Sequence, residues 1–284
     1  MLVTMESVLD YAEANQCAIG AFNVTTLEGI MATLEAAEEL KQPVILQFAQ
    51  VHEALISIHT LGPIMVMMAE RASVPVCVHL DHGEDLDYIK KSLDMGFTSV
   101  MYDGSVLDFE RNVANTRMAV EIAADYGASV EAEIGSMGRE EFGSVGAEGE
   151  AVASLYTDPD EAQEFVERTG IDALACSFGT VHGLYLTEPK LDFDIISAIR
   201  KKAHIPVVMH GGSGVSAEDF RQCIERGVRK INYYTYAAKA GGQAVKDQCA
   251  AEEDIVYFHD VAIWGKEAMK ADVRKAMKVF ASLS

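Results

Sequence analysis

The chain has 284 residues, and 44 acidic against 23 basic residues give it a formal net charge of −21. This charge argues against nucleic acid and against an anionic membrane surface as partners, because both would repel an acidic protein. Hydrophobic residues make up 49% of the chain, enough for a substantial core. No apolar run is long enough to span a membrane, and no basic segment precedes an apolar stretch as in a secretory signal. The five cysteines are scattered without paired spacing, so we expect a cytoplasmic protein.

Short apolar runs alternate with longer helical patterns along the whole chain. The runs predict eight strands, over Ala18–Phe22, Pro43–Phe48, Pro75–Leu80, Ser99–Tyr102, Ser129–Ile134, Ala173–Ser177, Pro206–Met209 and Lys230–Tyr233. The periodic segments predict helices over Thr26–Leu40, Glu84–Met95, Phe109–Tyr126, Asp160–Thr169, Ile195–Lys202 and Ala217–Arg226. Asp158 and Pro159 form a strong helix start, with Asp158 as the N-cap. Continuously apolar strands indicate a parallel sheet that helices cover.

Eight such β/α units closed into a ring make a (β/α)₈ TIM barrel, and no linker divides the chain, so we predict one domain over residues 1–284. An open doubly wound sheet is the alternative, but no GxGxxG motif follows the first strand. Two segments exceed what a barrel needs. Gly135–Leu155, after the fifth strand, has the length and composition of a functional loop. The apolar pattern of Ala251–Ser284 predicts a helical extension.

Three histidines, His82, His182 and His210, each follow an apolar run and precede a glycine. Three imidazoles with one open position are typical of a catalytic zinc site, and the adjacent Asp81 is a candidate general acid/base. Strict alternation places Asp81 and His82 on opposite faces of a strand, so the turn at Gly83 must redirect one of them. The sequence does not show which.

Other polar residues follow the same predicted strand ends, where barrel enzymes place their chemistry. They are Asn23, Asp103, Glu131, Glu133 and Asn232. A second group consists of glycines after two of the histidines: Gly183, Gly211, Gly212 and Gly214. Bare amides before the helix expected at Ala217 would suit an anion, although a tight turn with nothing bound is an equal alternative.

Several strings together resemble the class II, zinc-dependent aldolases, which cleave fructose or tagatose 1,6-bisphosphate and related ketose phosphates. They are Val78-His-Leu-Asp81-His82, Tyr102-Asp103-Gly-Ser105, Val130-Glu-Ala-Glu133, Gly179-Thr-Val-His182-Gly183, His210-Gly-Gly-Ser-Gly214 and Asn232. The resemblance covers nearly the whole chain, and the family fold is a (β/α)₈ barrel, in agreement with the strand count.

The resemblance implies a role for each matching residue. His82, His182 and His210 would hold a catalytic zinc ion, with Asp103 and Glu133 either behind it or holding a divalent ion in a second position. Asp81 would be the acid/base at the hydroxyl whose C–C bond breaks. Glu141 of the long loop, or Glu140 beside it, would exchange the carbanion proton.

The resemblance also implies the reaction and the ligand. The reaction is reversible retro-aldol cleavage of a ketose (bis)phosphate to dihydroxyacetone phosphate and an aldehyde, through an enediolate that zinc stabilises. The phosphate of dihydroxyacetone phosphate would be bound, with help from Na⁺ or K⁺, by Gly183, Gly211, Ser213, Asn232 and Thr235. Asn23 lies at the same rim and is a further candidate for substrate contact. We expect a homodimer or homotetramer.

The chain departs from the family pattern where a second phosphate would bind. Tyr234 stands where bisphosphate aldolases tend to carry a small or acidic residue, and Leu186 stands where they often carry a basic or small one. No basic residue follows Lys278. We therefore expect an aldehyde half that lacks a phosphate or carries it elsewhere. Arg139, or a basic residue from a neighbouring subunit, could still bind a second phosphate, and the substrate would then be a bisphosphate.

Three rival functions remain open. A Schiff-base aldolase needs a lysine at a strand end, and Lys230 is a poor candidate. A metal-dependent amidohydrolase expects a His-x-His pair, whereas His79 and His82 are three positions apart. A non-catalytic, sugar-phosphate-binding companion of an aldolase is disfavoured by the intact Asp81, histidines and Glu141.

Overall fold

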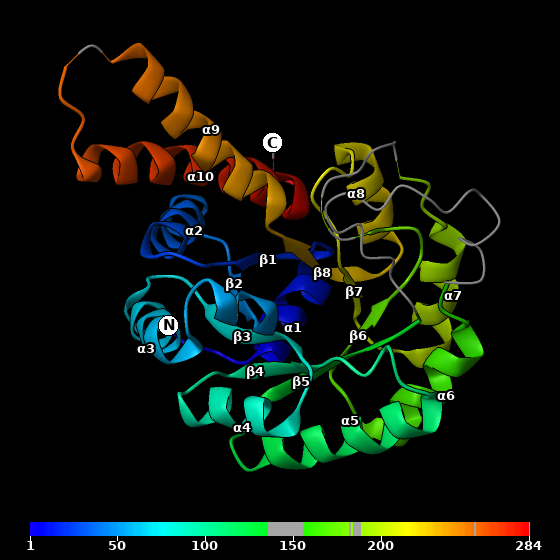
Figure 1. Cartoon of the computed structure of the whole chain (residues 1–284). Coiled ribbons are helices and arrows are strands. Elements are labelled where there is room, and N and C mark those ends of the chain that lie inside the picture. The colour runs from blue at the N-terminus through cyan, green and yellow to red at the C-terminus, as the bar shows by residue number, and fades with distance from the viewer. Residues whose placement is uncertain (136–155, 182, 184–188, 253, 284) are drawn as a thin grey trace.

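The computed structural model describes residues 1–135, 156–181, 183, 189–252 and 254–283. Eight parallel strands form a closed barrel in chain order, in which the last strand pairs with the first (Figure 1). The strands are β1 (Ile19–Asn23), β2 (Val44–Ala49), β3 (Val76–Gly83), β4 (Ser99–Tyr102), β5 (Ser129–Ile134), β6 (Ala173–Cys176), β7 (Val207–Met209) and β8 (Val228–Tyr233). This confirms the predicted TIM barrel and excludes the open sheet.

All six helices named from the sequence are present. They are α2 (Leu27–Leu40), α4 (Leu86–Asp94), α5 (Phe109–Ala124), α6 (Pro159–Thr169), α7 (Phe193–Ala203) and α8 (Ala217–Glu225). Helix α6 begins as predicted, since the Asp158 carboxylate accepts hydrogen bonds from the amides of Asp160 and Glu161.

Four further elements were not named from the sequence: α1 (Met5–Asn15), the short 3₁₀ helix η1 (Gln50–Ala54), α3 (Ile58–Arg71) and α9 (Thr235–Ala251). The tail contains the expected helix, α10 (Phe258–Phe280). In Figure 1, α9 and α10 form a hairpin that projects beyond the barrel. Its base is tied to α2 by ion pairs from Lys266 and Lys270 to Glu35, at 2.8 and 3.2 Å.

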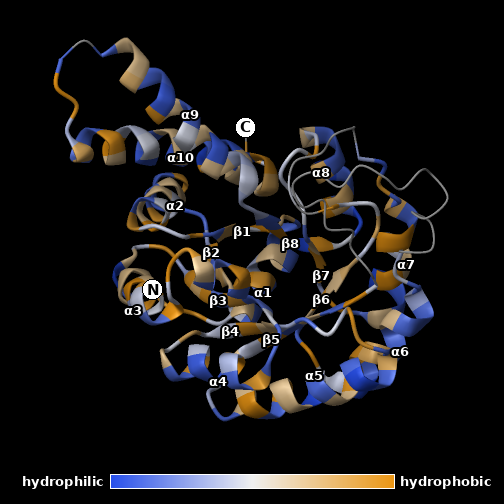
Figure 2. Cartoon of the chain, viewed as in Figure 1, coloured by the Kyte–Doolittle hydropathy of each residue, from blue (hydrophilic) through white to orange (hydrophobic). Residues whose placement is uncertain are grey.

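Apolar side chains form two separate cores. The larger lies between the outer face of the strands and the helices, and includes Phe48, Leu80 and Phe165. Figure 2 shows the corresponding division on the helices, with hydrophilic residues along their outer faces. The smaller core fills one end of the barrel interior, where Met5 and other apolar residues of α1 pack on inward-facing strand residues such as Ile45 and Val208. Helix α1 therefore closes the amino-terminal end of the barrel.

Toward the carboxyl ends of the strands the barrel interior becomes polar. Its buried residues there are Gln47, Asp81, Glu131, Glu133, His79, His210, Lys230 and Asn232. Buried polar groups need partners, so this concentration of them at one end marks the part of the fold built for chemistry. No helix in the described part of the chain is long and apolar enough to cross a bilayer.

Candidate active site and metal centre

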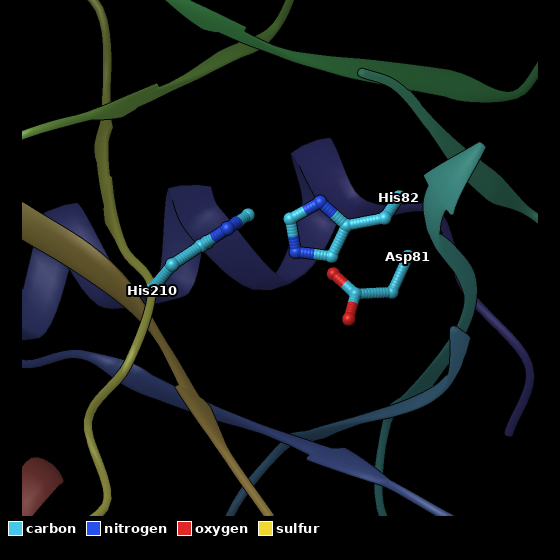
Figure 3. Close-up of side chains that lie close together, drawn as sticks. All are labelled: Asp81, His82 and His210. Atoms are coloured by element: carbon cyan, nitrogen blue, oxygen red, sulfur yellow. The ribbon is translucent and has the colours of Figure 1, made fainter. Parts of the chain in front are cut away.

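The end of β3 turns two successive side chains toward the same site. Its pairing with β4 shifts between Leu80 and Gly83, and His82 adopts a left-handed backbone conformation with φ of 49°. This conformation is uncommon for a residue other than glycine, and strand irregularities of this kind re-aim side chains. Figure 3 shows Asp81 and His82 both directed toward His210. His82 is therefore the residue that the turn redirects.

Two amide groups hold the Asp81 carboxylate. Asn23 donates from Nδ2 to Oδ2 at 2.8 Å, and Asn232 donates from Nδ2 to Oδ1 at 3.0 Å. Gln47 in turn donates to Oδ1 of Asn23 at 2.8 Å, which fixes the direction of that amide. Burial opposes ionisation of Asp81, but neighbouring positive charge, chiefly that of His82, holds the pKa of its carboxyl well below the ordinary value. These surroundings favour the ionised form of Asp81, which is the form that a general base needs.

His82 is oriented by Asp103, which follows β4. Nδ1 of His82 lies 2.7 Å from Oδ2 of Asp103, and Oδ1 of Asp103 accepts hydrogen bonds from the amide and hydroxyl of Ser105 at 3.1 and 2.6 Å. A carboxylate only accepts, so Nδ1 donates and Nε2 is the atom through which the ring would coordinate a metal ion. Burial lowers the pKa of His82, but Asp81, Asp103 and Glu133 outweigh it and raise the pKa to about 10. The surroundings of this ring favour positive charge.

His210, which follows β7, faces His82 across the site. The two ring centroids lie 4.7 Å apart in an edge-to-face arrangement. Nε2 of His210 is 2.9 Å from Oε1 of Glu131, and Nδ1 is 3.4 Å from Oε2 of Glu133. Oε2 of Glu133 accepts no hydrogen bond from a described residue, and burial together with Asp103 raises the pKa of Glu133 well above its ordinary value. A bound cation would satisfy such an oxygen.

These donors fit a divalent metal ion. Potential ligand atoms of Asp81, His82 and His210 lie within 4.8 Å of one another, as do those of His82, Asp103 and Glu133. Imidazole and carboxylate donors are those that zinc accepts, and the two groups share His82. The structure thus brings together four of the five predicted metal ligands, with His82 in both groups. The fifth ligand, His182, and the loop residues Glu140 and Glu141 lie outside the described residues.

A cavity of about 500 Å³ opens beside the two histidines and Asp81. All six predicted substrate-binding residues line it: Asn23, Gly183, Gly211, Ser213, Asn232 and Thr235. Gly211 has φ of 67°, and a Cβ there would overlap the carbonyl oxygen of Val181. Glycine at this position therefore lets the turn after β7 pack against the segment after β6.

Comparison with known proteins identifies the family. The model of the class II fructose-bisphosphate aldolases matches residues 3–284. The chain belongs to this family. It is 39% identical over 284 residues to the fructose-bisphosphate aldolase of Staphylococcus aureus, covering 98% of this chain and 97% of that one. It is 40% identical to the probable fructose-bisphosphate aldolase of Bacillus subtilis over 284 residues, covering 99% and 98%. The crystal structure of the YdjI aldolase of Escherichia coli K12 has a TM-score of 0.87 at 35% identity, covering 99% and 97%.

One wall of the aldolase cavity was not foreseen. It consists of η1 with the residue after it, and places Val51, His52 and Leu55 on the rim. Val51 and Leu55 are 70% and 69% exposed, and the ring of His52 lies 4.9 Å from that of Tyr234. Tyr234 stood out in the sequence as a departure from the family pattern, whereas η1 is too short to produce a periodic pattern.

Proposed function

We propose that the chain is a zinc-dependent aldolase that reversibly cleaves a ketose phosphate into dihydroxyacetone phosphate and an aldehyde. The observation that carries the proposal is the Asp81 carboxyl group, held by two amides beside His82 and His210 at the carboxyl end of the barrel. The family membership, with relatives named fructose-bisphosphate aldolase, supports the same reaction.

In the cleavage direction, Asp81 takes the proton of the hydroxyl group next to the C–C bond that breaks. The O–H electron pair forms the carbonyl of the aldehyde, and the electron pair of the C–C bond passes to the ketone half as an enediolate. Asn23 and Asn232 keep both carboxylate oxygens in place during this step. Glu141, placed by the sequence in the loop after β5, would return a proton to the enediolate carbon.

His82 and His210 would hold the metal, together with His182, which the sequence predicts as the third ligand. When bound, the ion supplies a Lewis acid that stabilises negative charge on the ketone oxygen. Asp103 keeps His82 in the required orientation through the contact between Oδ2 and Nδ1.

The phosphate would bind where Gly183, Gly211 and Ser213 line the cavity beside Thr235, the first residue of α9. Backbone amides at turns and helix starts bind phosphate well. A phosphate site made of backbone amides and a monovalent cation needs no basic side chain, and this suits a chain of net charge −21.

The ketose would carry one phosphate. Among the described residues that line the cavity none is a lysine or arginine, and the lining also includes the uncharged Val51, Leu55 and Tyr234. A second phosphate there would be desolvated without a cationic partner. A panel of ketose 1-phosphates and 1,6-bisphosphates, with release of dihydroxyacetone phosphate as the readout, tests this. We expect the highest kcat/KM for a 1-phosphate, and a bisphosphate that exceeds every 1-phosphate would contradict it.

The Schiff-base alternative has little support from the geometry. Nζ of Lys230 lies 2.7 Å from Oε2 of Glu131, and both side chains are fully buried. Lys230 is held in this ion pair and lies outside the set of described cavity-lining residues, so it is not placed to attack a carbonyl there.

A further inference from the structure

A lysine–glutamate ion pair lies inside the barrel, apart from the residues assigned to substrate. Lys230 of β8 and Glu131 of β5 are both fully buried, with Nζ 2.7 Å from Oε2. The two strands are not neighbours in the sheet, so the pair crosses the barrel interior. Apolar side chains of similar volume usually stabilise a fold at least as well as a buried ion pair. This pair therefore calls for a role other than stability.

The second oxygen of Glu131 contacts a proposed metal ligand. Oε1 lies 2.9 Å from Nε2 of His210. Because a carboxylate only accepts, this contact places the proton of a neutral His210 ring on Nε2. The lone pair is then on Nδ1, which lies 3.4 Å from Oε2 of Glu133, another of the proposed metal ligands.

The lysine is itself fixed from its other side. Nζ of Lys230 lies 3.5 Å from Nε2 of His79, whose Nδ1 is 2.8 Å from Oγ of Ser99. An ammonium group only donates, so Nε2 of His79 accepts and Nδ1 donates to the serine. Lys230 is thus held between His79 and Glu131, and it fixes which oxygen of Glu131 remains for His210.

We propose that Glu131 and Lys230 are positioning residues that hold His210 in its Nε2-protonated form, with Nδ1 directed at the metal. The inference rests on the proposed metal-dependent function. Carboxylates that fix a metal-binding histidine in this way change metal affinity about 10- to 100-fold when they are removed. The arrangement of donors and acceptors itself exists without the metal, so it can be measured separately.

The Glu131→Gln variant tests the direction of these hydrogen bonds. Lys230 can only donate, so it would keep the carbonyl oxygen of the new amide and leave the NH₂ group facing Nε2 of His210. That group also donates, which moves the ring proton to Nδ1 and blocks the metal-binding atom. We expect ¹⁵N NMR of histidine-labelled, chelator-treated protein to show an Nε2-protonated His210 in the wild type and an Nδ1-protonated ring in Glu131→Gln. The His210→Gln variant assigns the signal.

Zinc affinity, measured by competition with a chromophoric chelator, gives the second readout. It should fall about 10- to 100-fold in Glu131→Gln. Adding Lys230→Met frees the amide to turn its carbonyl toward His210, so the double variant should regain the Nε2-protonated ring and most of the affinity. Glu35→Gln, which loses an ion pair with Lys266 outside the barrel, is the matched control and should change neither readout.

Several outcomes would overturn the inference. One is an Nδ1-protonated His210 in the wild type, a result that does not depend on any variant folding. Another is a folded Glu131→Gln protein with an unchanged ring proton or with zinc affinity within twofold of the wild type. A lowered melting temperature with both readouts unchanged would assign the pair a purely structural role. Failure of the proposed function looks different: the wild type would bind no zinc, although the His210 ring proton would still be on Nε2.

Discussion

Replacement of Asp81 by asparagine separates proton transfer from binding. Both carboxylate oxygens accept an amide hydrogen bond, from Asn23 at 2.8 Å and from Asn232 at 3.0 Å. Asparagine offers one oxygen, so one of these amides would face another NH₂ group and lose an interaction of about 1.5–3 kcal/mol. Loss of the general base itself should lower kcat about 10²- to 10⁴-fold, equivalent to about 3–5 kcal/mol of transition-state stabilisation.

The assay for Asp81→Asn combines three measurements. Zinc content should stay near that of the wild type, calorimetric binding of dihydroxyacetone phosphate should persist, and kcat for cleavage should fall by the stated factor. Asp87→Asn, an exposed aspartate of α4, is the matched control and should behave as the wild type. The reasoning is refuted if Asp81→Asn keeps its zinc and its kcat stays within tenfold of the wild type. Loss of the zinc would instead make Asp81 a metal ligand.

Four further substitutions test other parts of the account. His82→Ala should lose bound metal and cleavage together, and metal analysis that finds full zinc content would remove His82 from the ligand set. Gly211→Ala should raise KM with zinc retained, because a Cβ overlaps the backbone after β6; an unchanged KM would argue against phosphate binding there. Glu141→Ala should abolish exchange of the α-proton of dihydroxyacetone phosphate, whereas loss only in Glu140→Ala would shift the assignment by one position. Met5→Ala should cost about 2–5 kcal/mol in the free energy of unfolding measured with urea, and a negligible loss would contradict a barrel end closed by α1.

The barrel could be predicted because short, mostly apolar runs alternate with longer segments of helical period along the whole chain. Of the three helices that were not named, α1 carries its buried residues at helical spacing, Met5, Val8, Leu9 and Ala12, so its pattern was present in the sequence. The sequences of the other two obscure the helical period. Helix α3 contains Gly62 and Pro63, and α9 contains Gly241 and Gly242, with Gly241 its sole buried residue. Packing against the rest of the fold stabilises such segments more than local propensity does.

The site could be predicted as a set of residues but not as a geometry. The redirection of His82 depends on a backbone φ of 49° and a shift in strand pairing, and neither leaves a pattern in the sequence. The contact between Glu131 and Lys230 joins strands that are far apart in the chain and not adjacent in the sheet. Residues on opposite walls of a barrel meet only once it closes, so their pairing could not be read from spacing.

The most direct test of the central claim is cleavage of a ketose 1-phosphate before and after metal removal. Chelator treatment should abolish release of dihydroxyacetone phosphate, and addition of one equivalent of zinc per chain should restore it. Sodium borohydride with substrate present should leave the activity intact, since the proposed mechanism uses no Schiff base. Full activity in the metal-depleted protein, together with inactivation by borohydride, would contradict the account.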